Sequence, residues 1–152
     1  MNGRRSAGAI AGSLAAGLAL SAVMLAGERL AGRPSELIEL ERKTGRKLGL
    51  RMPPDAVPAG LGEQALTHGG HLALSALAGL VYAAVVDEGD DGAASGAAFG
   101  VAFFVAAYGL VGPLLGVTPL PWREKPLRAV QHPVVHTLFG ICAALAARRW
   151  RR

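Results

Sequence analysis

Four long apolar runs constrain what this chain can fold into more than any other feature of the sequence. They cover about residues 7–27, 61–86, 93–117 and 129–147, and the charged residues cluster between and beyond them. Each run is close to the ~20 residues that a helix needs to cross the hydrocarbon core of a bilayer. We therefore predict an all-α integral membrane protein, a bundle of four transmembrane helices that forms one membrane domain over residues 1–152.

The alternative is a soluble bundle of hydrophobic helices. Such helices carry a polar outer face that repeats with the helical period, and the four runs lack that face. The composition agrees with the membrane prediction, because 51% of the residues are hydrophobic and only 5% are aromatic. This apolar content is high for a soluble domain with so few aromatic side chains.

The net charge of +5 comes from the loops and from the ends of the chain. Because the sequence has no basic helix face and no basic patch interleaved with aromatic residues, it does not indicate a nucleic-acid partner. We expect membrane lipids to supply the counter-charge, while a second copy or another membrane protein stays open as a further partner. The single cysteine, Cys142, excludes an internal disulfide, and its place in the fourth run predicts a buried thiol.

The first apolar run follows Arg4 and Arg5, a combination that also describes a secretory signal peptide. The run is longer than a typical signal core and ends at Gly27-Glu28-Arg29. We therefore predict an uncleaved first span.

The long polar loop, residues 28–60, has the pattern of a short surface helix in its first part. Pro34 and Ser35 suit a helix start, and Glu39 can pair with Lys43 one turn later. The prolines after residue 52 end the pattern. A solvated connecting loop is the alternative, since the apolar face of this segment is narrow.

Two of the apolar runs carry small residues at intervals of four. Such stripes allow helix backbones to approach closely, which is what drives helix association inside a lipid bilayer. We predict that both stripes face other helices. The first consists of Gly8, Gly12 and Ala16, and the second of Gly92, Gly96 and Gly100.

The connections between the other runs are short. Four acidic residues in positions 87–91 predict a solvated tight turn that makes the second and third spans a hairpin, although carboxylates could also bind a divalent cation. Gly112-Pro113 predicts a break near the end of the third span. Trp122 in the third connection and Trp150 in the arginine-rich tail are expected to be interfacial anchors.

All four histidines lie in two of the runs, at helical spacing: His68 with His71, and His132 with His136. The second and fourth spans run in the same direction, so their early positions share one membrane face, and at 1.5 Å rise the four depths overlap within roughly 10 Å. Glu63 is the carboxylate that we predict to lie near these histidines. The pattern permits interfacial histidines, a proton-sensing group, or a metal or haem site.

Several of these residues occur in a pattern that resembles the YagU-like inner-membrane proteins, a family named for a domain of unknown function. The pattern comprises the segment from His71 to Tyr82, the turn at positions 116–119, Pro121-Trp122 followed by Glu124, then His132 and the terminal arginines. The likeness covers about the last 90 residues, from Glu63 onward. His71, Ser75, Tyr82 and His132 match the family pattern, whereas His68 and His136 do not, so the resemblance implies a two-histidine site. We predict that His71 and His132 face each other across the second and fourth spans and that their protonation changes the packing of that face.

The resemblance implies a small bacterial inner-membrane protein without established enzymatic activity. We therefore expect no catalytic residue, no cofactor and no committed metal site, and a pH-responsive or stress-related module that acts through helix packing. The alternative is a metal- or haem-binding redox subunit or enzyme. For orientation, six Lys and Arg residues lie on the face with the termini and ten lie in the first and third connections. We nevertheless expect the termini inside, since the tail arginines adjoin the span ends and the resemblance implies it.

Overall fold

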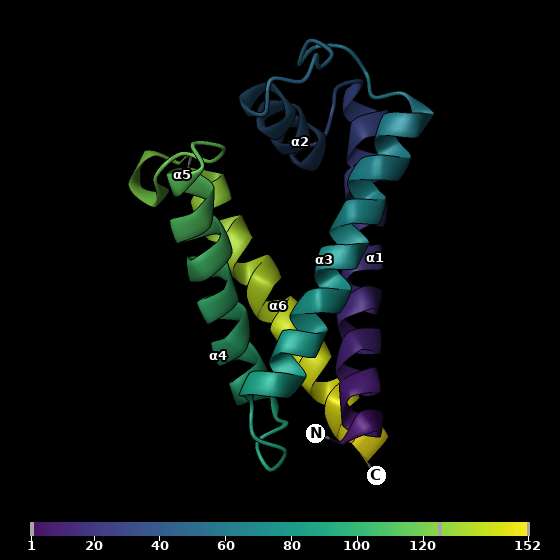
Figure 1. Ribbon diagram of the computed structural model, residues 1–152, viewed down its shortest axis with the longest axis vertical. Coiled ribbons are helices and arrows are strands. Elements are labelled where there is room, and N and C mark those ends of the chain that lie inside the picture. Colours follow the sequence, from purple (N-terminus) through teal and green to yellow (C-terminus); the bar gives the residue numbers. More distant parts are fainter. Residues whose placement is uncertain (1, 125, 152) are drawn as a thin grey trace.

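The computed structural model describes residues 2–124 and 126–151, and all regular structure in this part of the chain is helical (Figure 1). Four helices are long and apolar enough to cross a membrane, which confirms the predicted fold class. They are α1 (Gly3–Ala31), α3 (Leu61–Val85), the continuous unit of α4 (Ala93–Phe104), η1 (Val105–Val111) and α5 (Gly112–Leu114), and α6 (Pro126–Arg151). Arg152, the last residue of the predicted arginine tail, lies outside the described residues.

The predicted surface helix is α2 (Glu36–Lys47), so a solvated loop is the wrong description of that segment. Ser35 is its N-cap: the side-chain oxygen accepts a hydrogen bond from the backbone N–H of Ile38 at 3.5 Å. Capping of this kind satisfies one of the free N–H groups of the first turn. Helices α1 and α6 both begin before the apolar runs that predicted them, because polar residues extend the helices beyond the span.

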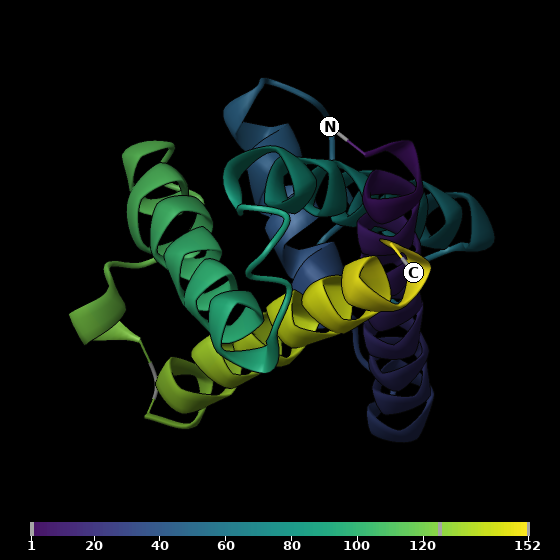
Figure 2. The ribbon, with the colours of Figure 1, turned by 90° about the horizontal axis from the view of Figure 1, so that it is seen from below.

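The long helices form two arms that meet at one end of the molecule and diverge toward the other (Figures 1 and 2). We call them the α1–α3 arm and the α4–α6 arm; α1 also packs against α6 where the arms meet. Both chain ends and the acidic turn lie at the closed end, here called the termini end. Helix α2 and the connections 48–60 and 115–124 lie at the open end, here called the α2 end.

The arms meet through small side chains. The buried hydrophobic cluster consists of Ala9, Tyr82, Ala83, Phe99, Ala143, Ala144 and Ala147. The rings of Tyr82 and Phe99 pack edge to face at 5.3 Å between centroids. Since these residues come from the first halves of α1 and of the third span and from the last parts of α3 and α6, the core lies toward the termini end.

Glycines of both predicted stripes pack against α6. A Cβ built on Gly12 would lie 2.5 Å from the carbonyl oxygen of Cys142, and one on Gly96 would lie 2.6 Å from that of Gly140. Gly8 and Gly100 are equally crowded by Ala146 and His136, so all four positions require a residue without a side chain.

Two members of the stripes do not have the predicted role. Gly92 is the N-cap of α4 and lies near only the carbonyl oxygen of Asp90, in its own turn. Ala16 is half-buried, and the close approach to α3 is made by Gly17, whose added Cβ would lie 2.5 Å from Ser75 Oγ. The strict spacing of four fails here because α1 contacts α6 and α3 in turn and has to present a different face to each.

The third span ends at Leu114, one residue after the proline that predicted a break. Before this end the helix widens into the π-helix η1, in which the N–H of Gly112 bonds the carbonyl of Ala107, five residues back. Pro113 lacks an N–H, and its ring would clash with the carbonyl four residues earlier in a regular α-helix. The widened turn is a local solution to this clash, and such turns often occur at functional sites.

Trp122 and Trp150 lie at opposite ends of the bundle, Trp122 in the short helix η2 (Pro121–Arg123) and Trp150 in the last turn of α6. Both side chains are exposed. Cys142 is also exposed, so the prediction of a buried thiol was wrong. The reason is the local face of α6: Gly140, Ala143 and Ala144 turn toward the other helices, and position 142 points outward.

Candidate functional site

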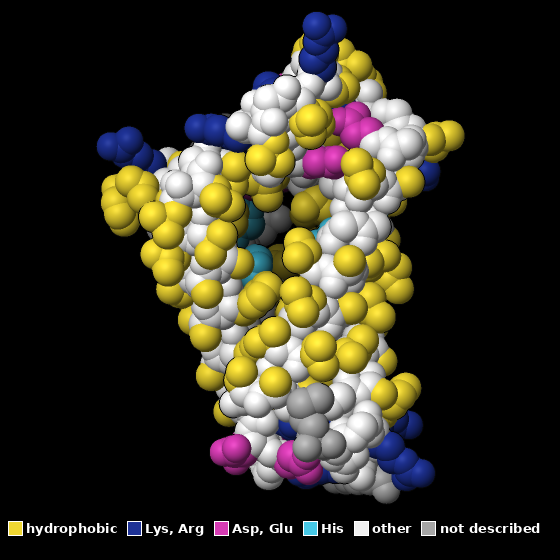
Figure 3. Space-filling model, viewed as in Figure 1, with side chains coloured by type: hydrophobic (Ala, Val, Ile, Leu, Met, Phe, Trp, Pro, Cys, Tyr) yellow, Lys and Arg dark blue, Asp and Glu magenta, His cyan; other side chains and the backbone are white. Residues whose placement is uncertain are grey.

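The four histidines line the region where the two arms diverge. His68 and His71 belong to α3, and His132 and His136 belong to α6. The space-filling view shows a hollow between the arms below α2, with histidine side chains on its walls (Figure 3). We call this hollow the histidine cleft.

On the α3 side, both histidines have partners that lead to α1. His68 Nε2 lies 3.0 Å from Gln64 Oε1, and the amide of Gln64 donates to the carboxylate of Glu28. His71 Nδ1 lies 3.1 Å from the hydroxyl of Ser21. These contacts fix both imidazoles on the wall of the cleft.

Across the cleft, α6 carries His132 and, one turn later, His136. His136 Nδ1 lies 2.8 Å from the carbonyl oxygen of His132, and its ring packs against Phe104 with 5.5 Å between centroids. His71 contacts Ser21, whereas His132 contacts Glu36, so the structure does not bring the predicted pair of His71 and His132 into contact. Spacing along a helix fixes the depth of a side chain, but the rotation of α6 about its axis decides which of its two histidines points toward α3.

His132 instead belongs to a polar cluster at the α2 end. Its Nε2 lies 3.1 Å from Glu36 Oε1 of α2, and its ring packs on Tyr108 of η1 at 4.2 Å between centroids. The hydroxyl of Tyr108 donates to Glu124 at 2.7 Å. Arg128, one turn before His132, also reaches Glu36, at 3.4 Å.

Glu63 does not serve the histidines as predicted. It accepts two hydrogen bonds from Arg42 of α2, at 2.6 and 2.8 Å. The fully buried guanidinium of Arg42 also donates to the carbonyl oxygens of Pro54 and Val57, at 2.7 and 2.9 Å. The hydrogen bonds with Glu63 raise the pKa of Arg42 above its ordinary value although burial opposes this shift. The guanidinium therefore stays charged and holds α2, the 48–60 connection and the start of α3 together.

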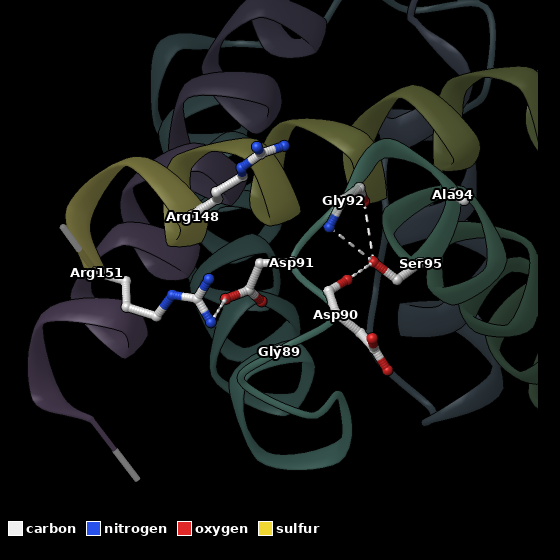
Figure 4. A pocket seen from close by; sticks show the side chains of 8 residues that line it. All are labelled: Gly89, Asp90, Asp91, Gly92, Ala94, Ser95, Arg148 and Arg151. Atoms are coloured by element: carbon white, nitrogen blue, oxygen red, sulfur yellow. Dashed lines mark hydrogen bonds and ion pairs between the residues drawn. The ribbon is translucent and has the colours of Figure 1, made fainter.

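At the termini end, the acidic turn is not a merely solvated turn. Asp91 is buried and accepts hydrogen bonds from Arg5 and, at 3.1 Å, from Tyr82 Oη. The turn borders an open pocket of about 560 Å³ (Figure 4). Arg148 and Arg151 of α6 line the pocket, and Arg151 lies 3.9 Å from Asp91.

Sequence reasoning missed the roles of Arg5, Arg42 and Asp91, which looked like solvated charges near the ends of helices. The only local feature was that Asp91 directly precedes Gly92, the N-cap of α4, and this position does not by itself indicate burial. The pairing of Arg5 with Asp91 could not be predicted from their spacing, since 86 residues separate them.

Among residues 2–124 and 126–151, no group of three or more His, Cys, Asp or Glu side chains is arranged to hold a metal ion. This holds for the histidine cleft and for the described acidic turn, so neither predicted metal alternative gains support. No protein-family model, curated protein or solved structure matches the chain. Fold and site together define a class: an all-helical protein with four helices able to cross a membrane and a histidine-lined cleft between two helical arms.

Proposed function

We propose that this chain is a non-catalytic, pH-responsive module of a bacterial inner membrane, in which protonation of the histidine cleft changes the separation of the two arms. One observation carries the proposal. The four imidazoles form a row along the walls of the histidine cleft, with His68 and His71 on α3 and His136 and His132 on α6, where Nδ1 of His136 lies 2.8 Å from the carbonyl oxygen of His132. The row lies at the end of the bundle where the arms diverge.

The groups around the row decide what a proton does there. Glu28 lies beyond Gln64 at one end, and Glu36 contacts His132 at the other, so a charge on either outer histidine has a nearby carboxylate. The two inner histidines, His71 and His136, face a hydroxyl from α1 and the rings of Phe103 and Phe104 from α4.

An imidazole ordinarily takes up a proton within about pH 5–8. If both inner histidines become charged, two like charges lie on opposite walls of a region of low dielectric constant, where their repulsion is strong. Widening of the cleft relieves this repulsion and admits water and anions. The arms can move in this way because their packed core lies at the other end.

We place both termini in the cytoplasm. The resemblance to YagU-like proteins supports this orientation, as do the exposed arginines Arg4, Arg148 and Arg149 beside the span ends. Arg5 adds nothing to this count, because Asp91 neutralises it. The α2 end and the mouth of the cleft then look outward, and reporter fusions at the C-terminus and in the 48–60 connection test the orientation.

The distance between the arms tests the function. Spin labels at the exposed positions Leu74 of α3 and Val101 of α4, in a Cys142→Ser background, report the width of the cleft in lipid nanodiscs. We expect a longer distance at about pH 5 than at about pH 8, the range in which imidazoles titrate.

The matched variants separate the inner histidines from the outer ones. His71→Gln/His136→Gln should remove the change with pH, because it removes both facing charges, whereas His132→Gln should retain it. A wild-type distance that does not change with pH would refute the proposed function. An unaltered response in the His71→Gln/His136→Gln protein would refute the role of the inner pair.

A further inference from the structure

Helix α2 lies at the α2 end beside the α1–α3 arm and projects toward the α4–α6 arm (Figure 1). Its attachment to the α1–α3 arm is strong. The backbone N–H of Ser35 donates to Glu28 of α1 at 3.0 Å, and Arg42 forms its two hydrogen bonds with Glu63 of α3. Because the guanidinium of Arg42 is fully buried and doubly bound, breaking this attachment would leave an unpaired charge.

The attachment of α2 to the α4–α6 arm is of a different kind. Glu36 contacts His132 at 3.1 Å and Arg128 at 3.4 Å, and Glu39 contacts Arg128 at 3.7 Å. The side chains of Arg128 and Glu39 are 36% and 43% exposed. Ion pairs that are open to solvent contribute little individually, so this side of α2 is the weaker one.

We infer that α2 is a hinged lid over the histidine cleft, held permanently on α3 by Arg42 and released from α6 at the contacts of Glu36 and Glu39. When these contacts are closed, α2 covers the mouth of the cleft. When they open, α2 swings with the α1–α3 arm and water reaches the histidines.

Charged and polar side chains from three elements surround the contact. Glu36 and Glu39 face it from α2, Arg128 and His132 from α6, and Tyr108 from η1. At neutral pH Arg128 supplies the attraction.

The distance from α2 to α6 tests the lid directly. Spin labels at the exposed positions Lys43 and Val134, again with Cys142→Ser, should give a single narrow distance in the wild-type protein in nanodiscs at neutral pH. Glu36→Gln/Glu39→Gln should lengthen and broaden it. The control is Glu41→Gln. It removes a carboxylate of the same helix that forms no ion pair with the described residues of α6, and it should keep the wild-type distance.

Arg128→Gln removes the partner of the same contact on α6. The test therefore still works if the Glu36→Gln/Glu39→Gln protein fails to fold. Wild-type distances in both the double variant and Arg128→Gln would overturn the lid. A change in the Glu41→Gln control as large as that in the double variant would overturn the assignment to Glu36 and Glu39.

A chemical readout tests whether the lid covers the cleft. Diethyl pyrocarbonate modifies neutral imidazoles, and peptide mass spectrometry resolves its rate at His71. At fixed neutral pH we expect a severalfold faster reaction in Glu36→Gln/Glu39→Gln than in the wild type or in Glu41→Gln. Equal rates would overturn the covering role.

The lid inference rests on the proposed function only for the role of the histidine cleft. The experiments on the lid and on the arms can therefore fail separately. The Leu74–Val101 distance reports on the arms, whereas the Lys43–Val134 distance reports on the lid. If the Lys43–Val134 distance changes in the variants but the Leu74–Val101 distance does not change with pH, the lid stands and the proposed function is refuted.

Discussion

The guanidinium of Arg5 and the carboxylate of Asp91 form a buried ion pair that joins the first turn of α1 to the turn between α3 and α4. Nε lies 2.9 Å from Oδ2, and Nη2 lies 2.9 Å from Oδ1. The same guanidinium donates to the carbonyl oxygens of Ala83 and Val86 at the end of α3, at 2.7 and 2.6 Å. Arg42 repeats this chemistry at the other end, with one carboxylate and two carbonyl oxygens, so each end of the bundle has one buried arginine that joins neighbouring segments.

Arg5→Gln should destabilise the fold strongly. It leaves Asp91 buried without its cation, and removing one partner of a buried pair costs about 3–5 kcal/mol. Denaturant unfolding in detergent micelles measures the loss. The control is Arg4→Gln, which removes an exposed charge from the same turn and should change stability little. Equal stability of the two variants would show that the Arg5–Asp91 pair does not hold the termini end.

Gly96→Ala should destabilise the bundle even though alanine favours helices. The added Cβ would meet the carbonyl oxygen of Gly140 at 2.6 Å and the Cβ of Ala144 at 2.8 Å, so α4 and α6 have to separate. Gly69→Ala is the matched control, since a Cβ there meets nothing within 4 Å and should gain about 1 kcal/mol of helix propensity. Opposite shifts of the melting temperature are expected. A stabilised Gly96→Ala protein would mean that α4 and α6 are not in close contact there.

Glu41 should make the stability of the protein depend on pH. Partial burial raises the pKa of its carboxyl group, and the nearby charge of Glu63 raises it further, while Arg42 opposes the shift. Within the described residues Glu41 Oε2 is buried without a hydrogen-bond partner. Because the pKa is higher in the folded protein, the group stabilises folding at a pH below its ordinary value, and this contribution is lost as the pH rises through the raised value.

Glu41→Gln should therefore remove this loss of stability at rising pH, because glutamine carries no titrating group. The free energy of unfolding, followed from about pH 4 to pH 8 where a raised carboxyl pKa acts, should fall less in the variant than in the wild type. Parallel curves for the two proteins would show that burial does not penalise the charge of Glu41.

The fold was predictable because a bilayer sets a length, and four apolar runs of that length leave few arrangements. The depth of the histidines followed in the same way from the rise of a helix. Which histidines face one another did not follow from the sequence. The rotation of α6 about its axis depends on its tertiary contacts with Gly96 and Gly100 of α4. The roles of Arg5 and Arg42 were hidden for a related reason, since a charge near a helix end looks the same in the sequence whether it is solvated or buried.

The contact between Tyr108 and Glu124 yields the last prediction. The hydroxyl of Tyr108 ties the π-helix η1 to the third connection, and Trp122 lies two residues before its acceptor. A hydrogen bond to a charged group contributes about 1.5–3 kcal/mol, so Tyr108→Phe should loosen the connection while the ring still packs on His132. In a Trp150→Phe background, the fluorescence anisotropy of Trp122 should fall. Tyr82→Phe removes the equivalent bond to Asp91 at the termini end and should leave this anisotropy unchanged. An anisotropy that is the same in Tyr108→Phe and in the parent protein would show that this hydrogen bond does not order the connection.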